Sequence, residues 1–269
     1  MLKTAFQKEL ILGDTLEQGS RGADVKRVQE WLTLNALRFP EVSLTTNVDG
    51  QFGPATKRAI CNFEDALDLP RTGVVTPDLF AQLSKPLATA FQAVASVPDV
   101  RRAVVQVAQM HLRQRATELQ TTDAQNLGPW VRSYCDGLDG SPFKWCAGFV
   151  QTVLDQVASA HGRSFTAIMP QTLSCDVLAV SGQQNGRLID NATLLKNPYR
   201  MQPGDVFLLR YPNAPDWYHT GLIIRIDGDV VETIEGNTDT KGSSNGTAVF
   251  ARVRNFRKTT MDVFTINGL

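Results

Sequence analysis

The sequence lacks both an excess of one charge and any long apolar run. Lys and Arg together number 27, as do Asp and Glu, among 269 residues. No overall positive field is available to hold nucleic acid or an anionic membrane, so we expect neither partner. The longest apolar runs, residues 146–150 and 221–224, are far shorter than the roughly 20 residues of a membrane-spanning helix. What remains is the composition and length of a globular protein with two domains.

A conventional export signal is also lacking. The first ten residues have neither the unbroken apolar core nor the small-residue cleavage site of a secretory signal. We therefore expect synthesis in the cytoplasm without a signal peptide, and any action elsewhere requires another delivery route.

Cysteine is scarce as well. The spacing of Cys61, Cys135, Cys146 and Cys175 fits no zinc-binding template. The helical pattern around Cys61 favours a small buried side chain there. A disulfide between Cys135 and Cys175 stays open, because no feature of the sequence argues for it.

Residues 19–84 have the periodicity of a compact helical unit. We expect Asp24 to cap a first helix, Pro54 to open a second, and Thr76 with Pro77 to open a third. Glycine-rich turns separate the three. The motifs at these turns are Gly19-Ser20-Arg21-Gly22-Ala23-Asp24-Val25, Val48-Asp49-Gly50-Gln51-Phe52-Gly53 and Gly73-Val74-Val75-Thr76.

In this order the motifs resemble the three-helix peptidoglycan-binding domain. The resemblance implies an all-α domain over residues 1–86 whose partner is peptidoglycan. Asp49 and Phe52 are its candidate substrate contacts, although most matching residues are also expected as turn formers or core.

Residues 87–98, bounded by prolines, have the composition of a linker with few contacts across it. Beyond it, in residues 99–269, helical patterns over 99–119 and 145–160 precede a series of strands. The expected strands cover residues 205–211, 220–226, 229–234, 247–254 and 262–266. Helices followed by consecutive strands indicate an α+β domain with an antiparallel sheet packed against helices.

Cys146 lies in the first turn of the second of these helices. Unpaired backbone N–H groups and the positive end of the helix dipole favour a thiolate there, and the Cys146 N–H can donate to a developing oxyanion. A nucleophile also needs a base. His219 opens a strand, whereas His111 and His161 are expected at the surface or at a helix end. Cys146 and His219 are therefore the candidate nucleophile and base.

A hairpin after His219 returns Glu235 and Asn237 to the same end of the sheet. A two-residue loop at 227–228 would pair His219 with Gly236 and turn both side chains away, whereas a three-residue loop puts all three polar groups on one face. We expect the three-residue loop. That loop also groups five apolar side chains on the opposite face: Leu222, Ile224, Ile226, Val230 and Ile234. Glu232 falls on the same face as a misfit and must reach solvent or a partner.

Four motifs in residues 130–266 carry a second resemblance. They are Trp145-Cys146-Ala147-Gly148-Phe149-Val150, Pro203-Gly204-Asp205-Val206, His219-Thr220-Gly221-Leu222-Ile223 and Ile234-Glu235-Gly236-Asn237. They resemble the CHAP family of cysteine, histidine-dependent amidohydrolases and peptidases. The resemblance implies a papain-like fold with Cys146 as nucleophile, His219 as base, Glu235 as orienting third member and Asn237 as a supporting polar residue.

Some CHAP members bind calcium through acidic residues near the cysteine. Asp136 and Asp139 are the candidates here, but turn formation is their expected role, and two acids without further oxygen donors make a poor site. We expect no metal and no other cofactor.

Aromatic residues flank the candidate pair. We take Trp145, Trp217 and Tyr218 as candidate substrate contacts. Trp217 and Tyr218 lie close in sequence to Tyr211. The three side chains either bind sugar or peptide, or they pack at the sheet edge, and both interpretations stay open.

The two halves together predict a monomeric peptidoglycan hydrolase with a Cys-His-Glu mechanism. The bond that it cleaves would be the N-acetylmuramoyl-L-alanine amide or a stem-peptide bond. The missing signal suits a phage endolysin released through a membrane lesion, or an antibacterial effector injected by a secretion machine. Two alternatives are a catalytically silent wall-binding protein and an acyltransferase that passes the same thioester to an amine.

Overall fold

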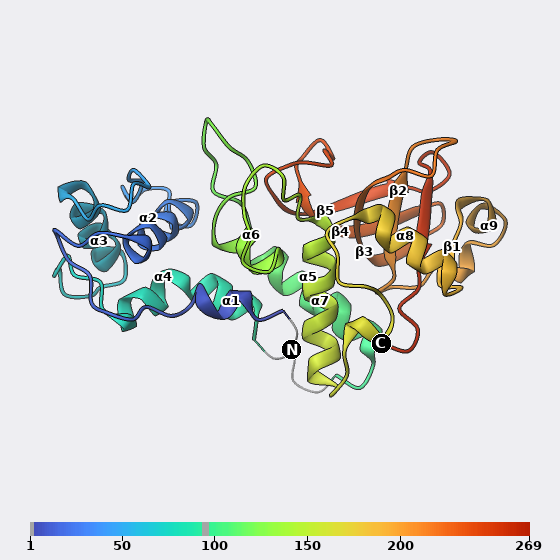
Figure 1. Cartoon of the computed structure of the whole chain (residues 1–269), viewed down its shortest axis with the longest axis horizontal. Coiled ribbons are helices and arrows are strands. Elements are labelled where there is room, and N and C mark those ends of the chain that lie inside the picture. Colours follow the sequence, from blue (N-terminus) through green and yellow to red (C-terminus); the bar gives the residue numbers. More distant parts are fainter. Residues whose placement is uncertain (1–2, 93–96) are drawn as a thin grey trace.

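The computed structural model describes residues 3–92 and 97–269. Its N-terminal part is helical, and its larger C-terminal part combines helices with a sheet (Figure 1). The first part contains α1 (Ala5–Lys8), α2 (Ala23–Asn35), α3 (Pro54–Ala66) and α4 (Pro77–Ala90). The helices that follow are α5 (Val100–Arg113), α6 (Pro129–Tyr134), α7 (Cys146–Ala160), η1 (Phe165–Ala167) and α8 (Cys175–Gln184).

The sheet of the C-terminal part has six strands in the described residues, in the order β1-β6-β2-β3-β4-β5, and every neighbouring pair is antiparallel. The expected antiparallel sheet beside helices is confirmed, whereas α6, α8, α9 and β1 were not predicted. The remaining elements are β1 (Leu188–Ile189), α9 (Asn191–Lys196), η2 (Pro198–Arg200), β2 (Val206–Arg210), β3 (Trp217–Asp227), β4 (Val230–Thr238), β5 (Ala248–Asn255) and β6 (Met261–Phe264).

Most helix starts follow local signals. Pro54 and Pro77 occupy the first turns of α3 and α4, and the Thr76 side chain caps α4. Asp24 does not cap α2, because Gly22 holds that position and Asp24 pairs with Arg27 inside the first turn. Helix α5 ends at Arg113, earlier than its predicted end at residue 119.

Helix α4 extends into the predicted linker. It passes through Pro86 and ends at Ala90, so the first residues of the 87–98 segment are helical, and residues 93–96 lie outside the described residues. A proline in a helix interior costs about 3 kcal/mol. Leu83 and Leu87, both fully buried on the same helix, provide packing that offsets this cost.

The two parts share a buried interface, so the expectation of few crossing contacts is wrong. Arg132 of α6 pairs with Glu9 at 2.8 Å and with Glu30 of α2 at 2.6 Å. Beside this cluster, the rings of Trp31 and Trp130 meet edge to face with centroids 6.3 Å apart. Apolar side chains of both parts belong to one continuous core. The N-terminal part is therefore packed onto the C-terminal part rather than tethered to it.

The substitution Glu30→Gln should destabilise the whole chain, because the Arg132 guanidinium loses a carboxylate that is only 2% exposed. We expect the free energy of unfolding, measured by urea denaturation, to fall by about 1–3 kcal/mol. The control is Asp65→Asn, which breaks the exposed pair with Arg71 and should cost less than about 1 kcal/mol. Equal effects of the two substitutions would contradict a structural role for the Arg132 cluster.

Candidate active site

Three separate elements bring Cys146, His219 and Glu235 together: the start of α7, the beginning of β3, and β4. Cys146 is 2% exposed, and the other two side chains are fully buried. Gly236 permits this approach of helix and sheet, because a Cβ there would lie 2.6 Å from the Cβ of Phe149 in α7. Any larger residue at this position would push α7 away from β4.

A β-bulge, not an odd loop, sets the register of the β3–β4 hairpin. The turn has two residues, Gly228 and Asp229, between the paired Asp227 and Val230, so the predicted three-residue loop is wrong. The extra residue lies in β3 instead. The register shifts between residues 223 and 225, which leaves Ile224 unpaired.

Between the bulge and His219, the pairing of β3 with β4 is the one that the three-residue loop would have produced. Continued from the Leu222–Ile234 pair, it places Gly221 opposite Glu235. A Cβ on Gly221 would lie 2.8 Å from the Glu235 Cγ, so the strand requires glycine at this close approach. His219 and Glu235 therefore share a face, as expected.

The bulge also reverses which face of the sheet the β3 side chains between Ile224 and the turn point to. Ile226 packs with Ile223 and Val231 rather than with Leu222 and Ile234. The predicted apolar grouping therefore holds on the His219 side of the bulge and fails between the bulge and the turn. Glu232 lies at the surface and pairs with Arg225 at 2.5 Å. The predicted misfit thus finds both solvent and a partner.

The Glu235 carboxylate is held by donors on several sides. His219 Nε2 lies 2.9 Å from Oε2, and the Thr233 hydroxyl donates to Oε1 at 2.5 Å. Arg254 of β5 donates through Nε and Nη2, at 2.6 and 2.5 Å. Burial raises the pKa of Glu235, but the bonds from His219 and Arg254 outweigh it and lower the pKa to about 2. Glu235 is therefore charged at neutral pH.

His219 uses Nε2 for Glu235, which leaves Nδ1 for proton transfer. Nδ1 has no hydrogen-bond partner within the described part of the chain, yet the imidazole and the Cys146 thiol are close enough to change each other's pKa. Burial lowers the pKa of His219, but Cys146 and Glu235 outweigh it and raise the pKa to about 9. The pair lies close but outside standard hydrogen-bond geometry, which is common before substrate binds.

The sulfur of Cys146 faces a second thiol. Its Sγ lies 3.9 Å from the Sγ of Cys175, the first residue of α8. The contact with Cys175 lowers the pKa of Cys146 well below its usual range, burial opposes this, and His219 adds to it. The same contact and burial raise the pKa of Cys175. The contact thus favours the thiolate at Cys146 and the protonated thiol at Cys175. All four cysteines are free, so Cys135 and Cys175 are not paired.

Asn237 makes no hydrogen bond to the imidazole in the described structure. Its side chain is buried in a backbone conformation with φ 55°, and Nδ2 lies 3.4 Å from the Oδ1 of Asn245, while Oδ1 has no hydrogen-bond partner among the described residues. The predicted supporting role of Asn237 stays a prediction, and Arg254 is the residue that donates to Glu235.

The predicted aromatic contacts are mostly structural. Trp145 is fully buried and stacks on Tyr134 with ring centroids 5.4 Å apart. Trp217 is 5% exposed, and its indole N–H donates to Asp262 at 2.7 Å. Tyr218 is half-buried against Tyr211, with centroids 4.6 Å apart, and Tyr211 is exposed. This tyrosine pair leaves an accessible aromatic surface next to His219 in the chain.

Asp49 and Phe52 also have structural positions. Phe52 belongs to the core, and Asp49 accepts from the Gln29 side chain and the Gln51 N–H, each at 2.9 Å, which fixes a turn. A surface groove of 280 Å³ lies elsewhere on this part, between the end of α3 and the start of α4. Its lining residues are Glu64, Leu69, Pro70, Thr72, Val74, Thr76, Asp78, Leu79 and Gln82.

His111 is a core residue, contrary to its expected surface position. It is fully buried, with Nδ1 2.9 Å from the Tyr134 hydroxyl and Nε2 2.7 Å from the Gln156 Oε1. Burial lowers the pKa of His111 to about 4, although Gln156 opposes the shift, so the ring is neutral at physiological pH. His161 directly follows α7, as expected.

Asp136 and Asp139 already have cationic and amide donors. Asp136 accepts from Lys3 Nζ and Gln171 Nε2, each at 2.8 Å, and Asp139 accepts from Arg132 at 2.8 Å. Within residues 3–92 and 97–269, no three His, Cys, Asp or Glu side chains are grouped so that they could hold a metal ion. None of the described helices has the length and apolar character needed to cross a membrane.

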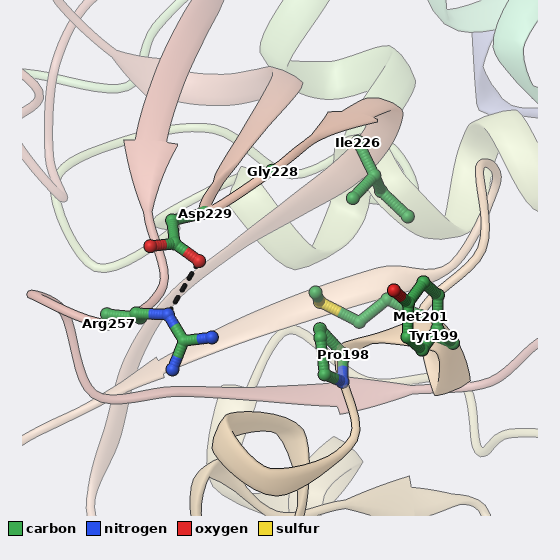
Figure 2. Close-up of a pocket in the computed structure, with 7 residues that line it drawn as sticks. All are labelled: Pro198, Tyr199, Met201, Ile226, Gly228, Asp229 and Arg257. Carbon is green, nitrogen blue, oxygen red and sulfur yellow. Dashed lines mark hydrogen bonds and ion pairs between the residues drawn. The ribbon is translucent and has the colours of Figure 1, made fainter.

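A wide pocket of 540 Å³ lies at the turn end of the β3–β4 hairpin (Figure 2). The Asp229–Arg257 ion pair at 2.6 Å borders it, with Tyr199 and Met201 on the other side. His219 lies near the opposite end of β3, roughly 25 Å away at the rise of an extended strand. This pocket is therefore separate from the candidate active site.

Comparison with known proteins identifies the N-terminal part. Residues 21–83 match the putative peptidoglycan-binding domain family, so the chain contains a peptidoglycan-binding domain. A zinc D-Ala-D-Ala carboxypeptidase of Streptomyces albus G is 35% identical over 69 residues, which is 26% of this chain and 26% of the relative's own length. The crystal structure of the SleB N-terminal domain has 28% identity and a TM-score of 0.25, covering 29% of this chain and 97% of that one.

The substitution Arg254→Met should raise the pH at which the Cys146 thiolate forms. Without the guanidinium, burial raises the pKa of Glu235, and a protonated Glu235 no longer stabilises the imidazolium. The measurement is the pH dependence of Cys146 alkylation by iodoacetamide, followed by peptide mass spectrometry. Arg257→Met, which breaks only the exposed pair with Asp229, is the matched control. An unchanged profile in Arg254→Met would contradict the positioning role of Arg254.

Proposed function

We propose that this protein is a peptidoglycan hydrolase that cleaves an amide bond of the cell wall through a covalent thioester, in a papain-like domain of the CHAP type. The peptidoglycan-binding domain supports the substrate class. The observation that carries the proposal is the buried series of polar groups from Cys146 through His219 and Glu235 to Arg254. The cleaved bond is the muramoyl–L-alanine amide or a stem-peptide bond.

In this proposal each group has a separate role. The Cys146 thiolate attacks the amide carbonyl, and the N–H groups of the first turn of α7 stabilise the oxyanion. The His219 imidazolium gives its Nδ1 proton to the leaving amine, which leaves a thioester on Cys146. The neutral imidazole then takes a proton from water, and the resulting hydroxide releases the acid and regenerates the thiolate. Glu235 fixes the ring orientation and the tautomer throughout.

Substrate entry requires local opening. The nucleophile is 2% exposed and its base is fully buried, so a peptide cannot reach the sulfur in this conformation. Closure has a chemical advantage, since exclusion of water strengthens the interaction between thiolate and imidazolium.

The substitutions Cys146→Ala and His219→Ala should each lower hydrolysis of purified sacculi by about 10³-fold or more, because the groups of such a triad act as a unit. Turbidity and mass spectrometry of released muropeptides measure the loss, and the products identify the cleaved bond. Sedimentation with sacculi should show that wall binding is retained. His161→Ala is the control, since His111 is a core residue. Lysis by Cys146→Ala at nearly the wild-type rate would refute the proposal.

The rate of hydrolysis should also fall as the pH rises through about 9. The raised pKa of His219 means that the imidazolium is present below this pH and is lost above it. In the neutral range the rate should stay high, because the pKa of Cys146 lies well below its usual value. Amine release from sacculi between pH 5 and 10 measures the profile. A rate that increases steadily to pH 10, as expected for an ordinary thiol with a pKa of about 8.5, would contradict the ion pair.

A further inference from the structure

We infer that Cys146 and Cys175 form an oxidative modification site, at which hydrogen peroxide converts the nucleophile into a reversible disulfide with its neighbour. The site would make the protein active only when reduced. That consequence rests on the proposed function, whereas the sulfur chemistry itself can be tested independently of it.

The positions of the two sulfurs favour bond formation. The Sγ atoms are 3.9 Å apart, and each belongs to the first residue of a helix. A disulfide requires about 2.05 Å, so the sulfurs must approach by roughly 2 Å. Cys146 and Cys175 are free thiols, and their side chains are 2% and 7% exposed. Access to either sulfur therefore requires local opening, and a molecule as small as hydrogen peroxide needs the least.

The start of α8 is held beside the active site by a bond to β3, and a cap fixes the first turn of the helix. Asp176, the residue after Cys175, accepts from the backbone N–H of Trp217 at 2.7 Å, and Trp217 lies two residues before His219. Ser174 caps α8 by accepting from the Val177 N–H at 3.3 Å. The second thiol is therefore fixed next to the nucleophile by the fold of β3 and α8.

The reaction balances in two steps. The Cys146 thiolate attacks one oxygen of hydrogen peroxide, so an S–O bond forms, the O–O bond breaks and hydroxide leaves; the sulfur is oxidised to a sulfenic acid. Cys175 then attacks this sulfur. The S–S bond forms, the S–O bond breaks, and the departing oxygen leaves as water with the proton of Cys175.

Electrostatics favours this order of events. The negative Cys146 raises the pKa of Cys175, so the second thiol stays protonated while the nucleophile is reduced. A sulfenic acid is neutral, and its formation removes this effect. Cys175 therefore becomes easier to deprotonate only after Cys146 has been oxidised. Under reducing conditions the two cysteines stay without a disulfide.

The remaining cysteines provide an internal comparison. Cys61 and Cys135 are buried and free. Burial raises the pKa of Cys135 to about 12, which disfavours the thiolate that reacts with peroxide. Both residues should stay unmodified under conditions that oxidise Cys146.

The test treats the full chain with hydrogen peroxide, blocks free thiols with iodoacetamide, and maps non-reduced peptides by mass spectrometry. We expect a peptide linked through Cys146 and Cys175, and recovery of most of the sacculus hydrolysis after dithiothreitol. In Cys175→Ser and Cys175→Ala, Cys146 should proceed to sulfinic acid, and dithiothreitol should restore little activity. Cys135→Ala should behave like the wild type.

Two results would overturn the inference: sulfinic acid at Cys146 in the wild type without a linked peptide, or equal recovery in the wild type and in Cys175→Ser. Circular dichroism shows whether each variant is folded, and the serine variant keeps the shape of the side chain with a smaller atom in place of sulfur. The linked peptide is detected by mass, so it can appear even if the protein hydrolyses no wall. Conversely, hydrolysis without a linked peptide contradicts this inference and leaves the proposed function intact.

Discussion

Glu235 is a fully buried carboxylate, and burying such a group without partners would cost several kcal/mol. Arg254 and Thr233 offset most of this cost by donating to both oxygens. The carboxylate that remains charged can then hold His219 at 2.9 Å and favour the imidazolium. The Cys175 thiol and the His219 imidazolium both lower the pKa of Cys146, against the effect of burial. The candidate site thus depends on one arginine in β5 that touches none of the reacting atoms.

The strand geometry meets a second constraint. A hairpin with a two-residue turn and no irregularity would turn Glu235 away from His219. The bulge at Ile224 adds one residue to β3, which corrects the register near the site and leaves the tight turn at Gly228 intact. Strand β4 alternates without interruption there, so Val231 enters the core and Glu232 on the opposite face pairs with Arg225 at the surface. One irregularity in β3 therefore brings His219 and Glu235 to the same face of the sheet.

The sequence predicted the parts of the site that depend on local signals. A cysteine at a helix start, a histidine early in a strand and a glutamate on the return strand are visible from periodicity and turn residues. The register was predicted correctly but for the wrong reason, since bulges leave no pattern in alternating residues. Thr233 could have been found, because it lies two residues from Glu235 on the same strand. Arg254 could not, because only the β4–β5 pairing brings it to Glu235.

Other differences arise from tertiary contacts that periodicity does not encode. Helix α8 is short and was missed, although Ser174 is a recognisable cap, and Cys175 was therefore not placed near Cys146. No local signal in the sequence marks Arg132, Glu9 and Glu30 as partners, because their ion pairs form only once the two parts are packed together. Asp49 and Phe52 matched a family motif, yet motifs of this kind mostly preserve turns and core.

The packed interface changes how the peptidoglycan-binding domain would assist the proposed hydrolysis. A flexible linker would raise the local concentration of wall substrate without selecting an orientation. Here the Arg132 cluster and the shared apolar core hold the domain in one position relative to Cys146. Wall strands bound by this domain would then reach the cysteine in a restricted range of directions. Because the orientation is fixed by buried contacts, removal of the domain would also leave Arg132 and Trp130 without their partners, so binding, orientation and stability cannot be separated by truncation alone.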